Sequence, residues 1–151
     1  MSAVVKENFA QMLRAAEASG AEAARRVVAR FQTDDVLTLA RRAGVEIVYE
    51  RWPLVTLGEC EKRNRTIRVN LNAIEWAHHV KHPVEEFMLR AIIAHELGHF
   101  FEAQDERSPT DARTRQVIRE RAAHGFAAQL LQVSCADLMS VGSHLKIACK
   151  W

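Results

Sequence analysis

The stretch IIAHELGHFF, from Ile92 to Phe101, places two histidines and a glutamate within an otherwise apolar run. If this run is a helix, His95 and His99 lie on one face with about 6 Å of rise between them, so both imidazoles can reach one ion. Glu96 directly follows the first histidine and projects to the side of that ion, where it can hold a water molecule. These relations underlie the H-E-x-x-H pattern, which predicts a zinc site with a general base.

The competing interpretation is that these three residues are core polar groups, hydrogen-bonded to the backbone or to one another. The composition of the chain gives about 0.03 chance matches to the pattern. Burying an unpaired polar group costs about 1 to 3 kcal/mol, and an apolar helix offers such groups few partners. The metal site is therefore the favoured interpretation.

A zinc site of this kind needs a third protein ligand, and three carboxylates are candidates. Glu102 continues the same helix about 10.5 Å of rise beyond His95, too far along the axis for a shared ion. Asp105 takes the third-ligand position of the metzincin pattern H-E-x-x-H-x-x-G-x-x-H, but Glu102 stands where that pattern needs glycine. A return helix can place Glu120 opposite the two histidines. Glu120 is favoured as the third ligand, and Asp105 stays open.

Other histidines also need an interpretation. His124 follows Glu120 by one helical turn, so it is expected near the metal, where it could orient a ligand or stabilise an oxyanion. It is therefore a candidate catalytic residue, and the alternative is a histidine without catalytic duty. His78 and His82 have metal-like spacing and flank His79, but no carboxylate with a matching role is evident nearby. A solvated face is favoured for this second cluster.

The hydrophobic patterning predicts an α+β fold, with a small sheet of about three strands packed on helices. In this fold the H-E-x-x-H helix and the following third-ligand helix form the zinc site. Two helices are expected within residues 2–31, with a break near Ser19-Gly20. The remaining expected elements are a short helix at 33–44, strands at 45–50, 54–60 and 66–70, a buried helix beginning at Pro83, a helix at 111–131 and a short helix in the tail.

The composition excludes several classes of protein. The chain has 151 residues, of which 48% are hydrophobic and 26% are charged, as is usual for a globular domain. A net charge of +2 is too small to argue for nucleic-acid binding. Lys6 and Glu7 interrupt the N-terminal region where a signal peptide needs an apolar core, and no run is long enough for a membrane span. Cys60, Cys135 and Cys149 form no C-x-x-C pair and suit reduced thiols. We expect a cytoplasmic protein that neither binds a membrane nor contacts nucleic acid directly.

Two longer segments resemble a known family. AIIAHELGHFF followed by IRERAAHGFAAQLL is similar to the ImmA/IrrE family of gluzincin-type metallopeptidases, in which the second helix reads roughly E-x-x-A-N-x-F-A-A-x-L-L. The upstream segments GVEIVYE and RTIRVN resemble the leading strands of that family, so the resemblance spans roughly residues 36–131. The chain departs from the family at His124, where Asn is usual, and at Gln132-Val133, where Pro commonly occurs. Its tail lacks the extra domain of some relatives.

The resemblance implies a single metallopeptidase-like domain over residues 1–151. It comprises N-terminal helices at 1–33, a zinc peptidase core at 34–133 and a C-terminal tail at 134–151. By position, His95, His99 and Glu120 match the zinc ligands and Glu96 matches the general base. The implied activity is zinc-dependent endopeptidase hydrolysis, with site-specific cleavage of a regulatory protein such as a helix-turn-helix transcriptional repressor. By analogy with gluzincins, a strand near TIRVN would pair with the extended substrate.

The alternative from another class is a non-catalytic zinc protein, in which the metal stabilises the fold or a partner-binding surface. Structural zinc sites usually close the fourth coordination position with Cys or His, and Cys60 or His124 could serve there. A metal-free regulator that retains a relic of the motif is a weaker third option.

Overall fold

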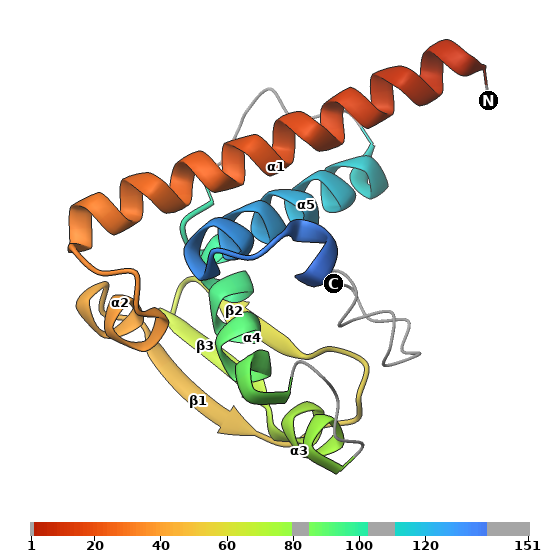
Figure 1. Cartoon of the computed structure of the whole chain (residues 1–151). Helices are drawn as coiled ribbons and strands as arrows, with labels where there is room; N and C mark the ends of the chain where they lie inside the picture. Colours follow the sequence, from red (N-terminus) through yellow and green to blue (C-terminus); the bar gives the residue numbers. More distant parts are fainter. Residues whose placement is uncertain (1, 80–84, 103–110, 139–151) are drawn as a thin grey trace.

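The computed structural model describes residues 2–79, 85–102 and 111–138, and its elements form a small sheet covered by helices (Figure 1). The predicted α+β class is confirmed. Predictions that concern Pro83, His82, Asp105, Cys149 and most of the C-terminal tail lie outside the described residues. In chain order the elements are α1 (Ala3–Phe31), α2 (Val36–Arg42), β1 (Glu46–Glu50), β2 (Gly58–Glu61), β3 (Thr66–Asn70), α3 (Leu71–His79), α4 (Glu85–Phe100) and α5 (Ala112–Leu131).

The N-terminal segment is one helix of 29 residues, so the predicted break near Ser19-Gly20 is wrong. Gly20 is buried in the middle of α1, where the backbone of α5 approaches it. A Cβ atom at Gly20 would lie 1.9 Å from the carbonyl oxygen of Ala122, and one at Gly125 would lie 2.1 Å from that of Glu17. These glycines therefore allow close helix packing, and neither ends a helix.

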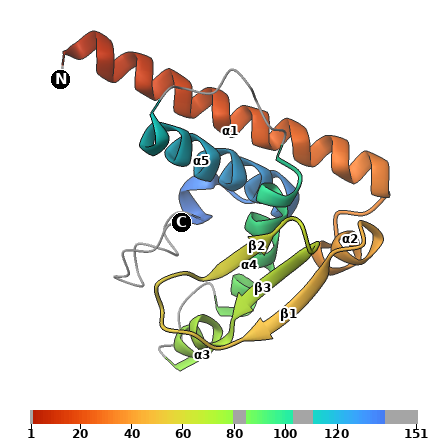
Figure 2. The same ribbon diagram turned by 180° about the vertical axis from the view of Figure 1, so that it is seen from behind.

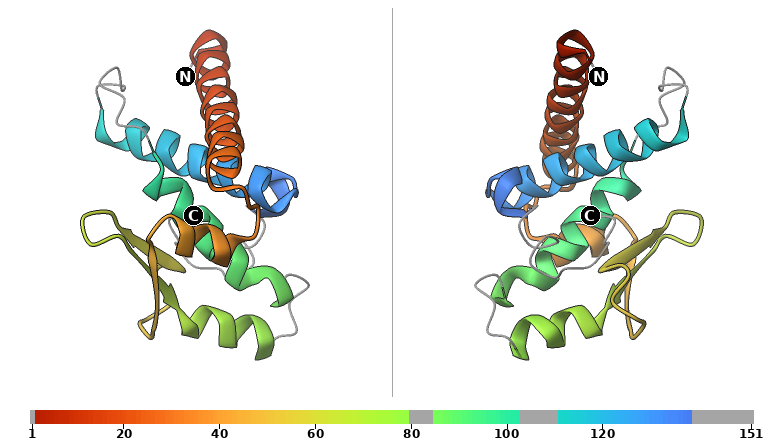
Figure 3. Two further views of the ribbon diagram at one scale, coloured as in Figure 1. Left: turned by 90° about the vertical axis from the view of Figure 1, so that its left-hand side faces the viewer. Right: turned by 90° about the vertical axis from the view of Figure 1, so that its right-hand side faces the viewer.

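The two helices that contain these glycines lie side by side over much of their length (Figures 1 and 3). Arg25 donates a hydrogen bond of 3.1 Å to Gln129, and Arg121 donates one of 3.5 Å to Glu17. Both pairs join residues that are 104 positions apart in the chain. The α1–α5 contact thus brings the beginning of the described chain against a region near its end.

The sheet has the strand order β1-β3-β2, with β1 parallel and β2 antiparallel to the central strand β3. The segment TIRVN is β3 and is paired on both sides, so it cannot itself accept a substrate strand. Among the described strands, β2 is an edge strand and packs against α4. If a peptide pairs with the sheet next to α4, β2 is the strand with a free edge there.

Strand β2 begins later than the predicted strand at 54–60, because the chain first forms a loop held by a buried asparagine. The side-chain amide of Asn70 donates to the carbonyl oxygens of Trp52 and Thr56. The oxygen of the same side chain accepts from the backbone N–H of Asn72, at the start of α3. Helix α3 was missed because its start depends on this side chain and because only Ala73 and Ala77 of the helix are fully buried.

Helix α4 lies between the sheet on one side and the α1–α5 pair on the other (Figures 2 and 3). The expectation of a buried helix is confirmed, because Ile92, Ile93, Ala94 and Leu97 have no exposed surface. Helix α5 begins where predicted, and the carboxylate of Asp111 accepts from the backbone N–H of Thr114 as an N-cap. None of the helices in the described part of the chain combines the length and the apolar character that crossing a bilayer requires.

Replacing Gly20 by Ala tests the close approach of α1 and α5. Alanine favours a helix by about 1 kcal/mol over glycine, so an ordinary helical glycine would be stabilised by this change. Here the added methyl group meets backbone that cannot rotate away, and overpacking of this kind costs about 1 to 3 kcal/mol or more. We expect urea unfolding to show a net loss of stability for Gly20→Ala. The exposed neighbour provides the control, because Ser19→Ala should leave stability within about 0.5 kcal/mol of the wild type. Equal or higher stability of Gly20→Ala would contradict the packing.

Candidate metal centre

Two helices supply the residues of the candidate site. Helix α4 carries His95, Glu96 and His99 in its C-terminal half, and α5 carries Glu120. The helices approach closely beside the site, because a Cβ atom at Gly98 would lie only 2.9 Å from the Cα atom of Ala123. This close approach brings a carboxylate of one helix within reach of both imidazoles of the other.

The three side chains that were predicted to be metal ligands lie close together. The Nε2 atom of His95 lies 3.1 Å from Oε2 of Glu120, and that of His99 lies 3.3 Å from Oε1. The two Nε2 atoms are 3.2 Å apart. Ligand atoms about 2.0 to 2.1 Å from a tetrahedral zinc ion are separated by about 3.3 Å, so these distances fit such an ion. His95, His99 and Glu120 could therefore hold a metal ion.

Burial and charge set the protonation of these ligands. His95 is 1% exposed, and burial lowers its pKa to about 4, which keeps its imidazole neutral. Burial alone would raise the pKa of Glu120, but its hydrogen bonds with His95 and His99 outweigh that effect and lower it to about 2. In His99, burial acts to lower the pKa, but the hydrogen bond with Glu120 and the negative charges of Glu120, Glu96 and Glu102 together outweigh it, so the pKa is raised. Glu120 is accordingly a carboxylate placed between two imidazoles.

Glu96 is buried beside this group without belonging to it. Its side chain extends toward β2, where a Cβ atom on Gly58 would lie 3.2 Å from Oε1 of Glu96 and 2.7 Å from Cγ2 of Ile92. Glu96 is 4% exposed, and burial raises its pKa to about 7. The absence of a side chain at Gly58 thus leaves room for the carboxyl group between α4 and the edge strand.

His124 contacts the ring of His95 and is not one of the three converging side chains. Its Nδ1 atom is 2.6 Å from the carbonyl oxygen of Glu120, so the Nδ1–H donates to that oxygen. Its ring packs edge-on against the ring of His95, with centroids 4.7 Å apart. His124 is only 3% exposed and is not among the residues that could hold a metal ion together. This position suits a residue that supports the His95 ring.

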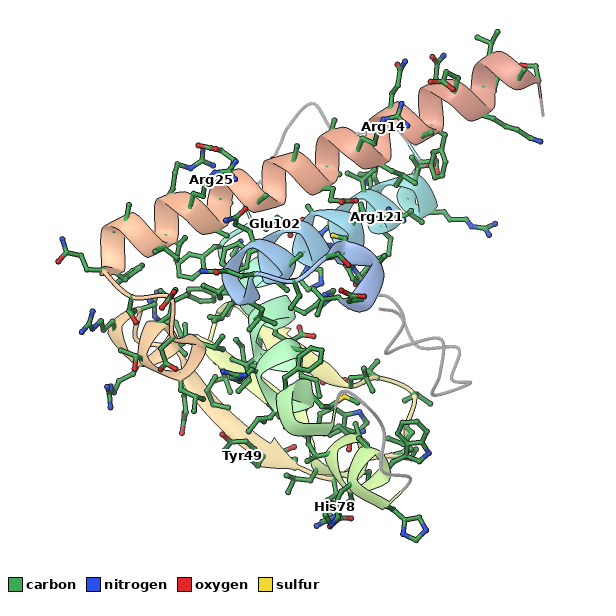
Figure 4. The ribbon with its side chains drawn as sticks, in the orientation of Figure 1. Arg14, Arg25, Tyr49, His78, Glu102 and Arg121 are labelled. Carbon is green, nitrogen blue, oxygen red and sulfur yellow. The ribbon has the colours of Figure 1, made fainter. Side chains whose placement is uncertain are left out.

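The other candidate ligands lie elsewhere. The expectation that Glu102 continues the helix is wrong, because α4 ends at Phe100. Glu102 accepts from Arg119 through both carboxylate oxygens at 3.0 and 3.1 Å. Figure 4 shows His78 at the lower edge of the molecule, away from Glu102. Cys60 and Cys135 are free, half-buried thiols, and burial raises the pKa of each to about 12. Within the described ranges, no second group of three or more metal-capable residues accompanies His95, His99 and Glu120.

Two residues of the site did not emerge from the sequence. Gln116 lies one turn before Glu120 on α5. Its side-chain amide donates a 2.8 Å hydrogen bond to Oε1 of Glu120. The spacing of four residues on one helix could have indicated this contact. The spacing alone is not specific, because many glutamines precede a glutamate by four residues. The role of Gly58 beside Glu96 could not be predicted from the sequence, because it depends on which strand lies beside α4.

Comparisons of the chain with protein-family models, with curated proteins and with solved structures give no match.

Proposed function

We propose that this protein is a zinc-dependent peptidase whose ligands are His95, His99 and Glu120 and whose general base is Glu96. One observation carries the proposal: two imidazole nitrogens and a carboxylate converge at distances suited to a tetrahedral ion, with a second buried carboxyl group beside them. Two histidines and a glutamate form a ligand set used in catalytic zinc sites, in which water or substrate takes the fourth position.

A structural zinc site is the less favoured function. Structural sites usually add a fourth Cys or His ligand. Neither Cys60 nor His124 joins the metal-capable group among the described residues. A purely structural site would also leave the position of Glu96 unexplained, because a buried carboxyl group outside the ligand set adds nothing to metal coordination.

In the proposed reaction the protein residues bind the substrate and move one proton. Zinc, when bound, supplies Lewis acidity toward a water molecule and toward the scissile carbonyl group. Glu96 accepts the proton of the attacking water at its carboxylate and returns it to the leaving amine. The free edge of β2 binds the substrate in extended form, which places the peptide backbone next to Glu96.

The proposed substrate is a regulatory protein, such as a helix-turn-helix transcriptional repressor. Support for this choice comes from the resemblance of residues 36–131 to the ImmA/IrrE family. A peptidase with one protein substrate can be silent toward generic peptides, so the assay uses co-expression with candidate repressors.

The first prediction concerns the metal. We expect the purified protein to bind one zinc ion per chain, and His99→Ala or Glu120→Ala to abolish stoichiometric binding because each removes one of three protein ligands. His78→Ala is the control and should keep its zinc. X-ray absorption should show nitrogen and oxygen ligands only. Sulfur or a third imidazole in the coordination shell would instead support the structural site.

The second prediction concerns the base. Glu96→Gln keeps the shape of the side chain but cannot accept the proton, so cleavage of a co-expressed repressor should fall by about 10²- to 10⁴-fold. Zinc content should stay at the wild-type value, because Glu96 lies outside the ligand group. The exposed Glu7 on α1 provides the matched control, and the Glu7→Gln variant should cleave the repressor at the wild-type rate. Cleavage by Glu96→Gln at the wild-type rate would refute the assignment.

The third prediction concerns the space beside the base. Gly58→Ala adds a methyl group that meets Ile92 and the Glu96 carboxyl group, so the base is displaced. A displacement of this kind should lower the cleavage rate by about 10- to 100-fold while zinc stays bound. Glu7→Ala, on the exposed surface of α1, should leave the cleavage rate unchanged. An unchanged rate for Gly58→Ala would show that Glu96 does not need this space.

A further inference from the structure

In the group that could hold a metal ion, Glu120 is the one residue that comes from α5. The ring of His95 is held on two sides, by the ring of His99 at 4.8 Å and by that of His124 at 4.7 Å. Glu120 comes from the opposite helix, and its side chain is 17% exposed. Rotation about the terminal torsion of a glutamate is soft, so packing alone does not fix its two oxygens.

Gln116 supplies a restraint on that rotation. Its Nε2–H donates to Oε1 of Glu120 at 2.8 Å, which is shorter than the contacts of 3.1 and 3.3 Å between this carboxylate and the two histidines. With the amide bound to Oε1, Oε2 faces His95 and Oε1 also lies 3.3 Å from Nε2 of His99. An ionised carboxylate can only accept, so the amide of Gln116 must present its N–H₂ side to Glu120.

Gln116 contacts the Glu120 carboxylate with a neutral side chain, although two arginines flank Glu120 in the sequence. Arg119 and Arg121 flank Glu120 in the sequence, but Arg119 binds Glu102 and Arg121 pairs with Glu17. Both cations are thus paired with other carboxylates. Gln116 donates a hydrogen bond without bringing a positive charge, so it orients the carboxylate and leaves its negative charge available for a cation.

We propose that Gln116 is a positioning residue for the metal, which holds the Glu120 carboxylate in the orientation that faces the two histidines. This inference rests on the proposed zinc site but not on peptidase activity. Removing an outer partner of a metal ligand typically lowers metal affinity by about 10- to 100-fold. A purely helix-stabilising contact between Gln116 and Glu120 would instead lower stability and leave the affinity unchanged.

The test measures zinc affinity by competition with a chromophoric chelator, using the full-length protein. Gln116→Met keeps the length of the side chain without its donor, and Gln116→Asn keeps an amide that is too short to reach Glu120. We expect both variants to bind zinc about 10- to 100-fold more weakly. The visible spectrum of the cobalt-substituted protein should shift in both, because the carboxylate is reoriented. Gln129→Met, at an α5 position that bonds to Arg25, is the matched control and should match the wild type within about twofold.

The outcomes separate this inference from the proposed function. Wild-type affinity and an unchanged cobalt spectrum in both Gln116 variants would overturn the role of Gln116 and leave the zinc site standing. If only Gln116→Asn binds zinc with wild-type affinity, any polar side chain at this position suffices. That result would also overturn the role of Gln116. If the wild-type protein binds no zinc, both the metal site and the role of Gln116 fail.

Discussion

The close contact of α5 with two other helices is the constraint on which the rest of the structure depends. On one side, Gly20 and Gly125 let α1 and α5 approach at the level of their backbones. On another side, Gly98 of α4 lies against the backbone of Ala123. Small residues on both contact faces thus set the position of α5. Because Glu120 is on this helix, they also set the distance between its carboxylate and the histidines of α4.

Helices α4 and α5 together bring two imidazoles against one carboxylate. His95 is buried and His99 is half-buried, and their hydrogen bonds with Glu120 keep its carboxylate ionised. The same arrangement explains how an apolar helix tolerates His95 and His99, because their partners are Glu120 on α5 and each other.

The sequence predicted the parts of the structure that follow local rules. Periodicity and the H-E-x-x-H spacing were enough to predict a buried α4, and the helix of Glu120 was expected at 111–131. The break predicted at Gly20 was wrong because glycine is both a helix breaker and the residue that close helix packing requires, and only the partner helix distinguishes the two. The roles of Gln116 and Gly58 could not be predicted, since each depends on a neighbour that tertiary packing supplies.

The pairing of α1 with α5 has a consequence for the time at which the site forms. The contacts Arg25–Gln129 and Glu17–Arg121 close a loop of more than a hundred residues, so they are among the most non-local in the molecule. During synthesis α1 emerges first, and most of its contact surface stays uncovered until α5 has been made. The two histidines likewise emerge before Glu120. A chain interrupted before α5 would therefore lack Glu120, and the group that could hold a metal ion is complete only when nearly the whole of the described chain has been made.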